Sequence, residues 1–219
     1  MKKLWAISIA ASILFSLGLS SYALDSPKVA EAKYKDLAAK VRSGDTSVDW
    51  QDLRLAAEVG DVAGNYDLLD ANARGTKAFN EGKYDDSLKI ANEMLDHNIA
   101  SGDAHFLAYI SLKHLGRQAE ADKEHALLGT FFKSIMNSGD GKSAATAWFT
   151  VNVHEEYLVI RLLLGMNVKS QSLSSQNGHD YDEMTVTDDS GKEATLWFNT
   201  DTDMQKMAGE LGKSKKKKK

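Results

Sequence analysis

Four residues in the second half of the chain are suited to acid–base chemistry if the fold brings them together: Glu155, Glu156, Tyr157 and Asp182. Carboxyl groups gathered in a cleft can act as acid and base when burial separates their pKa values. Glu155 and Glu156 are adjacent, so on a helix they point about 100° apart and do not flank one bond. Two interpretations stay open: a small-ligand or hydrolase cleft, and glutamates that stabilise a helix N-terminus.

Other motifs with known chemistry are incomplete. The glycine-rich residues 139–143 lack the first glycine of a phosphate-binding loop, because Met136 stands at its position. His154 and Glu155 resemble the start of a zinc-protease helix, but Leu158 replaces the second histidine. The six histidines show no metal-ligand spacing and the chain has no cysteine. We therefore predict no catalytic residues, no cofactor and no metal.

An internal repeat predicts the helices that would position these residues. Gly82 and Gly116 stand 34 residues apart, which is the period of a tetratricopeptide helix pair. Small residues, Ser87 and Ala121, follow each glycine by five positions, where two helices would approach closely. Apolar spacing predicts two further helices over 27–43 and 49–59. Residues 66–136 resemble the tetratricopeptide repeat family, although Tyr109 occupies the place of a repeat glycine.

The resemblance to this repeat family implies a concave groove that binds a protein or peptide partner. Polar side chains there would hydrogen-bond an extended peptide. The alternative is that Phe79, Phe106 and Ile110 pack against the N-terminal helices or the C-terminal module. The implied groove positions are Leu69, Asn72, Thr76, Phe79 and Asn80 in the first unit and Asp103, Phe106, Ile110, Lys113 and His114 in the second.

The pattern changes after residue 137. We expect a two-faced strand over 147–153, a helix over 154–164 that could instead be a buried strand, and a polar, turn-rich segment over 171–180. Two strands follow around Met184 and Leu196, joined by a hairpin turn over 188–192, and a last helix covers 201–211. The predicted fold is mainly α, with tetratricopeptide-like helical hairpins in 24–137 and a small α+β module in 138–212.

A second resemblance covers almost the whole mature chain. The chain is similar to domain of unknown function 4919, an uncharacterised family of exported bacterial proteins. The resemblance implies an envelope protein with helical hairpins and a small sheet, and it implies no activity. The segments that carry it are residues 48–54, 138–143, 155–157, 171–173, 181–182 and 196–199.

The two ends of the chain differ from its body. Lys2 and Lys3, an apolar run and the small residues before Leu24 are typical of a signal peptide over residues 1–23, cleaved after Ala23. We therefore expect a periplasmic or secreted protein. The net charge of the chain is −4 although both ends are rich in lysine, so the residues between the two ends are acidic. This acidic character excludes a nucleic-acid-binding face, which would need basic residues. The Lys-rich tail, residues 213–219, is expected to be disordered or to contact an anionic envelope surface weakly.

These observations together favour a non-enzymatic protein of the bacterial envelope. The helical hairpins would offer their groove to a protein or peptide partner of unknown identity. The alternative function is a small-ligand-binding protein or hydrolase that uses the carboxylates between the two modules.

Overall fold

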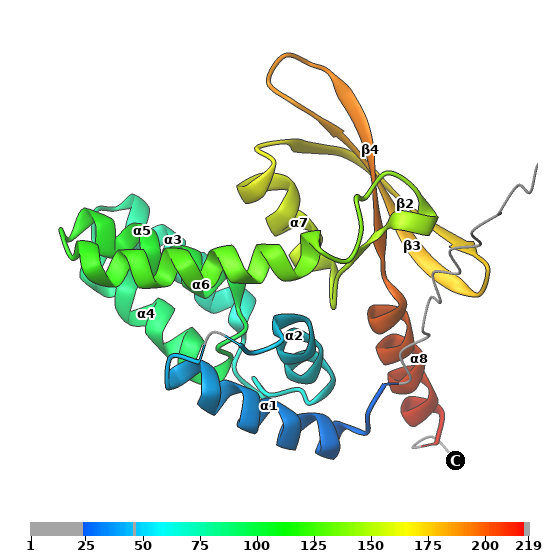
Figure 1. Ribbon diagram of the computed structural model, residues 1–219, viewed down its shortest axis with the longest axis horizontal. Coiled ribbons are helices and arrows are strands. Elements are labelled where there is room, and N and C mark those ends of the chain that lie inside the picture. The colour runs from blue at the N-terminus through cyan, green and yellow to red at the C-terminus, as the bar shows by residue number, and fades with distance from the viewer. Residues whose placement is uncertain (1–23, 46, 217–219) are drawn as a thin grey trace, which may run out of the picture.

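The structure, a computed structural model, describes residues 24–45 and 47–216 (Figure 1). The predicted signal peptide, residues 1–23, and the end of the tail, residues 217–219, lie outside the described residues. Within the described part of the chain, none of the helices combines the length and apolar character needed to cross a membrane.

The first two helices are α1 (Pro27–Arg42) and α2 (Trp50–Val59), close to the ranges that the sequence predicts. Pro27 begins α1, where its missing N–H and fixed φ are tolerated. The Asp49 side chain caps α2 by accepting a hydrogen bond from the Asp52 backbone. Trp50 and Leu53 of α2 are buried in one core cluster with Tyr34 of α1.

Two helical hairpins follow, formed by α3 (Leu68–Asn80) with α4 (Tyr84–His97), and by α5 (Gly102–His114) with α6 (Gln118–Met136). Both helices of the second pair begin 34 residues after their counterparts in the first, as the repeat predicts. Gly82 and Gly116 have φ of 76° and 71°, a left-handed conformation that favours glycine at the chain reversal. Ser87 and Ala121 are fully buried, which confirms the close approach of helices at these small residues.

The C-terminal part contains four strands and two helices. In chain order its elements are the 3-10 turn Ala144–Thr146, β1 (Trp148–Phe149), α7 (Val153–Leu158), the π-helical turn Val159–Leu163, β2 (Asn167–Gln176), β3 (His179–Thr187), β4 (Glu193–Asn199) and α8 (Asp201–Lys216). The strands form one sheet in the order β1-β4-β3-β2. The β1–β4 pair is parallel and the other two pairs are antiparallel. Helix α7 lies before the sheet hairpins, and α8 leaves the end of β4 (Figure 1).

Several sequence-based boundaries in this part are wrong. Residues 171–180 belong to β2 and β3 and to the turn between them, not to a turn-rich loop. Most side chains of β2 are exposed on both faces, so the strand has no apolar alternation to detect. The strand expected over 147–153 is two residues long, and the helix expected over 154–164 changes to π-helical geometry at Val159. Helix α8 continues to Lys216 and so includes residues 213–216 of the tail expected to be disordered.

One core cluster joins the helical part to the sheet. Phe131 and Ile135 of α6 share it with Ile160, Met184 and Phe198 from the C-terminal part. A second, smaller cluster lies within the helical hairpins. The mainly α fold with a small α+β module is thus confirmed, and a shared core fixes the C-terminal part against the helices.

Candidate functional site

A buried ion pair connects the N-terminal helices to α7. The guanidinium of Arg54, on α2, contacts Glu155 Oε2, and its Nε donates to Ser134 Oγ at 2.9 Å. The backbone N–H of Val151 donates to the same Glu155 oxygen at 3.0 Å. Burial raises the pKa of Glu155, while Arg54 and the Val151 amide oppose that rise by stabilising the carboxylate. The pair therefore fixes the start of α7 relative to α2.

A second buried pair, Glu156 and Asp182, connects α7 to β3. Glu156 is 0% exposed and Asp182 is 6% exposed. Burial, together with the neighbouring Asp182 charge, raises the pKa of Glu156 to about 10. Glu156 is therefore protonated at neutral pH and can donate to Asp182, which also accepts from Gln171 Nε2 at 2.6 Å.

The predicted carboxylate set is thus divided. Glu156 and Asp182 face each other in the interior, while Glu155 turns to Arg54. The hydroxyl of Tyr157 donates to Gln171 Oε1 at 3.3 Å. This separation follows from the angle between adjacent helical residues. Of the four residues, Glu155 lines the cavity described next.

A cavity of about 300 Å³ lies where the helical hairpins meet α7 and α8; we call it the junction groove. Carboxylates of Glu58, Asp103 and Asp203 line it together with the Arg54–Glu155 pair. Leu69 and Asp103, two of the predicted groove positions, form part of the wall. The predicted partner-binding surface therefore ends in a hollow that is rich in acidic groups.

Asp103 is held on both of its oxygens. Asn72 Nδ2 donates to Oδ1 at 3.1 Å, and His154 Nε2 contacts Oδ2. The Asp103 carboxylate raises the pKa of His154 because it stabilises the imidazolium. One residue from each predicted unit, Asn72 and Asp103, is thereby linked to α7.

Asp203 and Glu58 also line the junction groove. Asp203 Oδ2 accepts from the backbone N–H of Val153 at 2.9 Å. Glu58 accepts from Asn152 Nδ2 at 2.8 Å and contacts Lys206 Nζ. Burial raises the pKa of Asp203, and the negative charge of Glu58 adds to the rise. The groove therefore carries a carboxylate whose ionised form is destabilised by its surroundings.

The other predicted groove positions follow α3 and α5 away from this hollow. Phe79 meets the His114 ring edge-on, with centroids 5.0 Å apart, and Tyr84 stacks on His114 at 4.5 Å. Lys113 Nζ lies 5.4 Å from the Tyr109 ring centroid. Thr76 and Asn80 are exposed.

Three apolar members of the predicted groove pack against the two core clusters. Phe106 packs against the core shared with the sheet, as in the alternative that the sequence left open. Phe79 and Ile110 instead pack against the core of the hairpins themselves.

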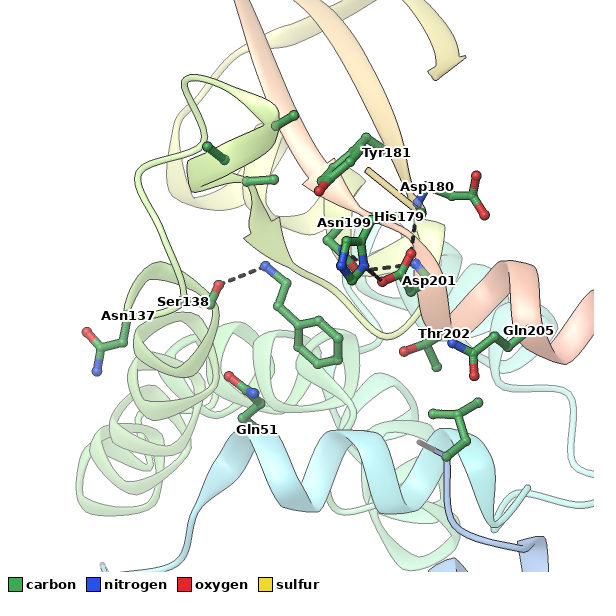
Figure 2. A pocket seen from close by; sticks show the side chains of 16 residues that line it. Gln51, Asn137, Ser138, His179, Asp180, Tyr181, Asn199, Asp201, Thr202 and Gln205 are labelled. Carbon is green, nitrogen blue, oxygen red and sulfur yellow. Dashed lines mark hydrogen bonds and ion pairs between the residues drawn. The ribbon is translucent and has the colours of Figure 1, made fainter. Parts of the chain in front are cut away.

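A second cavity, of about 510 Å³, lies on the sheet side of the junction; we call it the His179 cavity (Figure 2). His179 Nδ1 lies 2.5 Å from Asp201 Oδ2 at the start of α8. Asp201 is held in turn by the Asp180 backbone N–H at 2.8 Å and by Asn199 Nδ2 at 3.1 Å. Uncharged polar side chains from α2 and α8, including Gln51 and Gln205, complete much of the wall.

Comparison with known proteins identifies the family of the chain. The family model Domain of unknown function (DUF4919) matches residues 58–208, more than half of the chain. The chain belongs to the DUF4919 family. No curated protein and no solved structure matches the chain. Membership of the tetratricopeptide repeat family stays a prediction, although the hairpins have its period.

The DUF4919 match contains most of the residues that line the two cavities. The family model begins at Glu58. Residues 48–54, which the sequence analysis also included in the resemblance to this family, therefore lie outside the match. Sequence reasoning missed Arg54, His154 and Asp203 in the junction groove, and His179 and Asp201 in the second cavity. Apart from Asn199, which lies 2 residues before Asp201, their partners are 21 to 101 residues away in the chain, so local spacing does not indicate them.

Proposed function

We propose that this DUF4919 protein is a non-enzymatic binding protein of the bacterial envelope, and that its junction groove accepts a basic side chain of a peptide or protein partner. The observation that carries the proposal is that two carboxylates from different helices, Asp103 of α5 and Asp203 of α8, line one cavity of about 300 Å³. A cavity of this size accommodates one long side chain.

The charges in the groove favour a cation. Arg54 is occupied by Glu155, Lys206 contacts Glu58, and His154 contacts Asp103. Asp203 accepts a backbone hydrogen bond and has a raised pKa, so a positive ligand group would stabilise its ionised form. Charge-assisted hydrogen bonds from Lys or Arg to carboxylate are stronger than neutral ones.

The rim of the groove suits the stem of such a side chain. Leu69 is 61% exposed and Val153 is 39% exposed, and both line the groove. Lys and Arg commonly lay their methylene stems on apolar surface while the charged head reaches polar groups. A basic residue flanked by apolar contacts is therefore the recognition element that we propose.

The remaining predicted groove positions would contact the rest of the partner. Exposed Thr76, Asn80, Lys113 and His114 extend from the junction groove along α3 and α5. Their donors and acceptors suit an extended peptide backbone. The alternative function is a ligand cleft or hydrolase that uses Glu155, Glu156, Tyr157 and Asp182. It has less support because Glu156 and Asp182 are buried and Glu155 is paired with Arg54.

The test is selection of a displayed random peptide library on the chain without residues 1–23, followed by fluorescence polarisation with the selected peptides. We expect Lys or Arg to be enriched at one position. Asp203→Asn should weaken binding about tenfold, a change typical of losing one charge-assisted contact. The matched control is Glu93→Gln on the exposed face of α4, which should bind as the original chain does. The proposal would be contradicted if the selected peptides lacked a basic residue, or if Asp203→Asn bound them as tightly as the original chain does.

Export and surface contact are further proposals with their own measurements. Mass spectrometry of the exported protein should give an N-terminus at Leu24.

The chain should pellet with anionic vesicles at low salt and be released at high salt. Unchanged pelleting after deletion of residues 213–219 would rule out a role for the Lys-rich tail.

A further inference from the structure

We propose that the His179 cavity is a second binding site, separate from the junction groove, and that it takes a neutral polyhydroxylated ligand of the size of a mono- or disaccharide. The cavity is about 510 Å³, within the range of small-molecule sites. It lies between α2, the start of α8 and the ends of β3 and β4, as Figure 2 shows.

The lining carries many hydrogen-bonding groups and little unpaired charge. Amides and hydroxyls can donate and accept at once, which matches the hydroxyl groups of a sugar or polyol. Figure 2 shows Gln51 and Gln205 on two sides of the space. The uncharged polar lining residues are Gln51, Asn137, Ser138, Tyr181, Asn199, Thr202 and Gln205.

His179 is positioned to accept a hydrogen bond from the ligand. Because Nδ1 faces the Asp201 carboxylate at 2.5 Å, Nδ1 must carry the proton that is donated to it. In the neutral ring the other nitrogen, Nε2, is then an acceptor. Within residues 24–45 and 47–216, Nε2 has no hydrogen-bond partner. An alcohol O–H of the ligand would satisfy it.

Charge argues against an ionic ligand here. Asp201 already receives hydrogen bonds from His179, Asn199 and the Asp180 backbone. The Asp180 carboxylate accepts from Ser175 Oγ at 2.5 Å. An anion would face both carboxylates without a Lys or Arg among the lining residues, and a cation would compete with His179 for Asp201.

The cavity also offers an apolar surface. Phe149 lines it beside the hydroxyl and amide groups, and its backbone N–H donates to Ser138 Oγ at 2.7 Å. The C–H face of a sugar ring is apolar, so an aromatic side chain next to hydrogen-bonding groups complements both faces of such a ligand. The cavity therefore matches the mixed character of a saccharide better than that of a lipid or a metal ion.

The test is ¹H–¹⁵N NMR titration of the chain without residues 1–23. The probes are glucose, N-acetylglucosamine, maltose and xylitol, with glucose 6-phosphate and glucosamine as charged comparisons. We expect at least one neutral probe to shift the resonances of cavity residues, with Kd of about 1 mM. The charged comparisons should bind more weakly than their neutral parent.

Two variants locate the site. Gln205 is exposed on α8, so Gln205→Ala should fold normally and weaken binding about fivefold. His179→Ala removes both ring nitrogens, including the Nε2 acceptor, and should weaken binding further. Asn92→Ala, an exposed change on α4, and Asp203→Asn in the junction groove should leave binding unchanged. The inference would be overturned by the absence of shifts with every neutral probe, by tighter binding of a charged probe, or by Gln205→Ala and His179→Ala both binding as tightly as the original chain.

Discussion

Replacing Glu156 with Gln should remove a large part of the pH dependence of stability. The Glu156 carboxyl is fully buried beside Asp182, and its pKa is raised to about 10 from an ordinary value of 4.5. Glutamine has nearly the same shape, its amide can donate to Asp182, and its oxygen can accept from Thr150. The variant therefore keeps the contacts of protonated Glu156 and removes its titration.

The sign and size follow from proton binding. Between pH 4.5 and about 10 the folded chain holds a proton on Glu156 that the unfolded chain releases. The contribution of this group to stability is thus fully present below pH 4.5 and is lost as the pH rises toward 10. The slope is about 1.4 kcal/mol per pH unit, so raising the pH from about 6 to about 8 removes about 3 kcal/mol. The expected slope is constant here because both pH values lie inside this interval.

The assay is thermal and urea unfolding of both chains at about pH 6 and pH 8. We expect the free-energy advantage of Glu156→Gln to grow by about 3 kcal/mol between the two, which is about 6–12 °C in Tm for a domain of this size. The control is Glu93→Gln, an exposed change of the same type on α4. An advantage that is equal at both pH values, or a variant that is less stable at the higher pH, would refute the reasoning.

Two further predictions concern packing. Arg54→Met should destabilise the fold by about 3–5 kcal/mol in urea unfolding, because it leaves Glu155 buried without its cation. The double variant Arg54→Met with Glu155→Leu should recover most of that loss, because no buried charge remains. An Arg54→Met chain as stable as the original chain would contradict this prediction. Gly75→Ala should cost about 1–3 kcal/mol, because a Cβ there overlaps the Leu107 side chain. Gly129→Ala, in α6 with open space around it, should gain about 0.5–1 kcal/mol, so equal Tm changes for the two glycines would contradict the close approach at Gly75.

The strands show how far sequence reasoning reaches. The turn between β3 and β4 was predictable from Gly191, which has a φ of 82°. The turn between β2 and β3 carries an equally strong signal, Asn177-Gly178, and both residues have positive φ as a type I′ turn requires. The sequence analysis missed β2 because its side chains are mostly polar and show no apolar alternation. An exposed strand held mainly by backbone hydrogen bonds needs no apolar face.

The sequence by itself determined the helical hairpins and their 34-residue offset. A helix boundary is set by neighbours in the chain: Gly82 and Gly116 reverse it, and Ser87 and Ala121 allow close packing. The motifs after residue 138 also indicated the DUF4919 family, whose model matches residues 58–208. These features are local, and so they are visible in the order of the residues.

Only the tertiary structure decided which polar groups meet. Arg54 and Glu155 are 101 residues apart, and His154 and Asp103 are 51 residues apart. The helix angle separates the adjacent glutamates, but the group that each one meets depends on what packs on each side of α7. Here Arg54 contacts Glu155 and Asp182 neighbours Glu156. Burial then sets their charge, because desolvation acts through the folded surroundings and not through the chain neighbours.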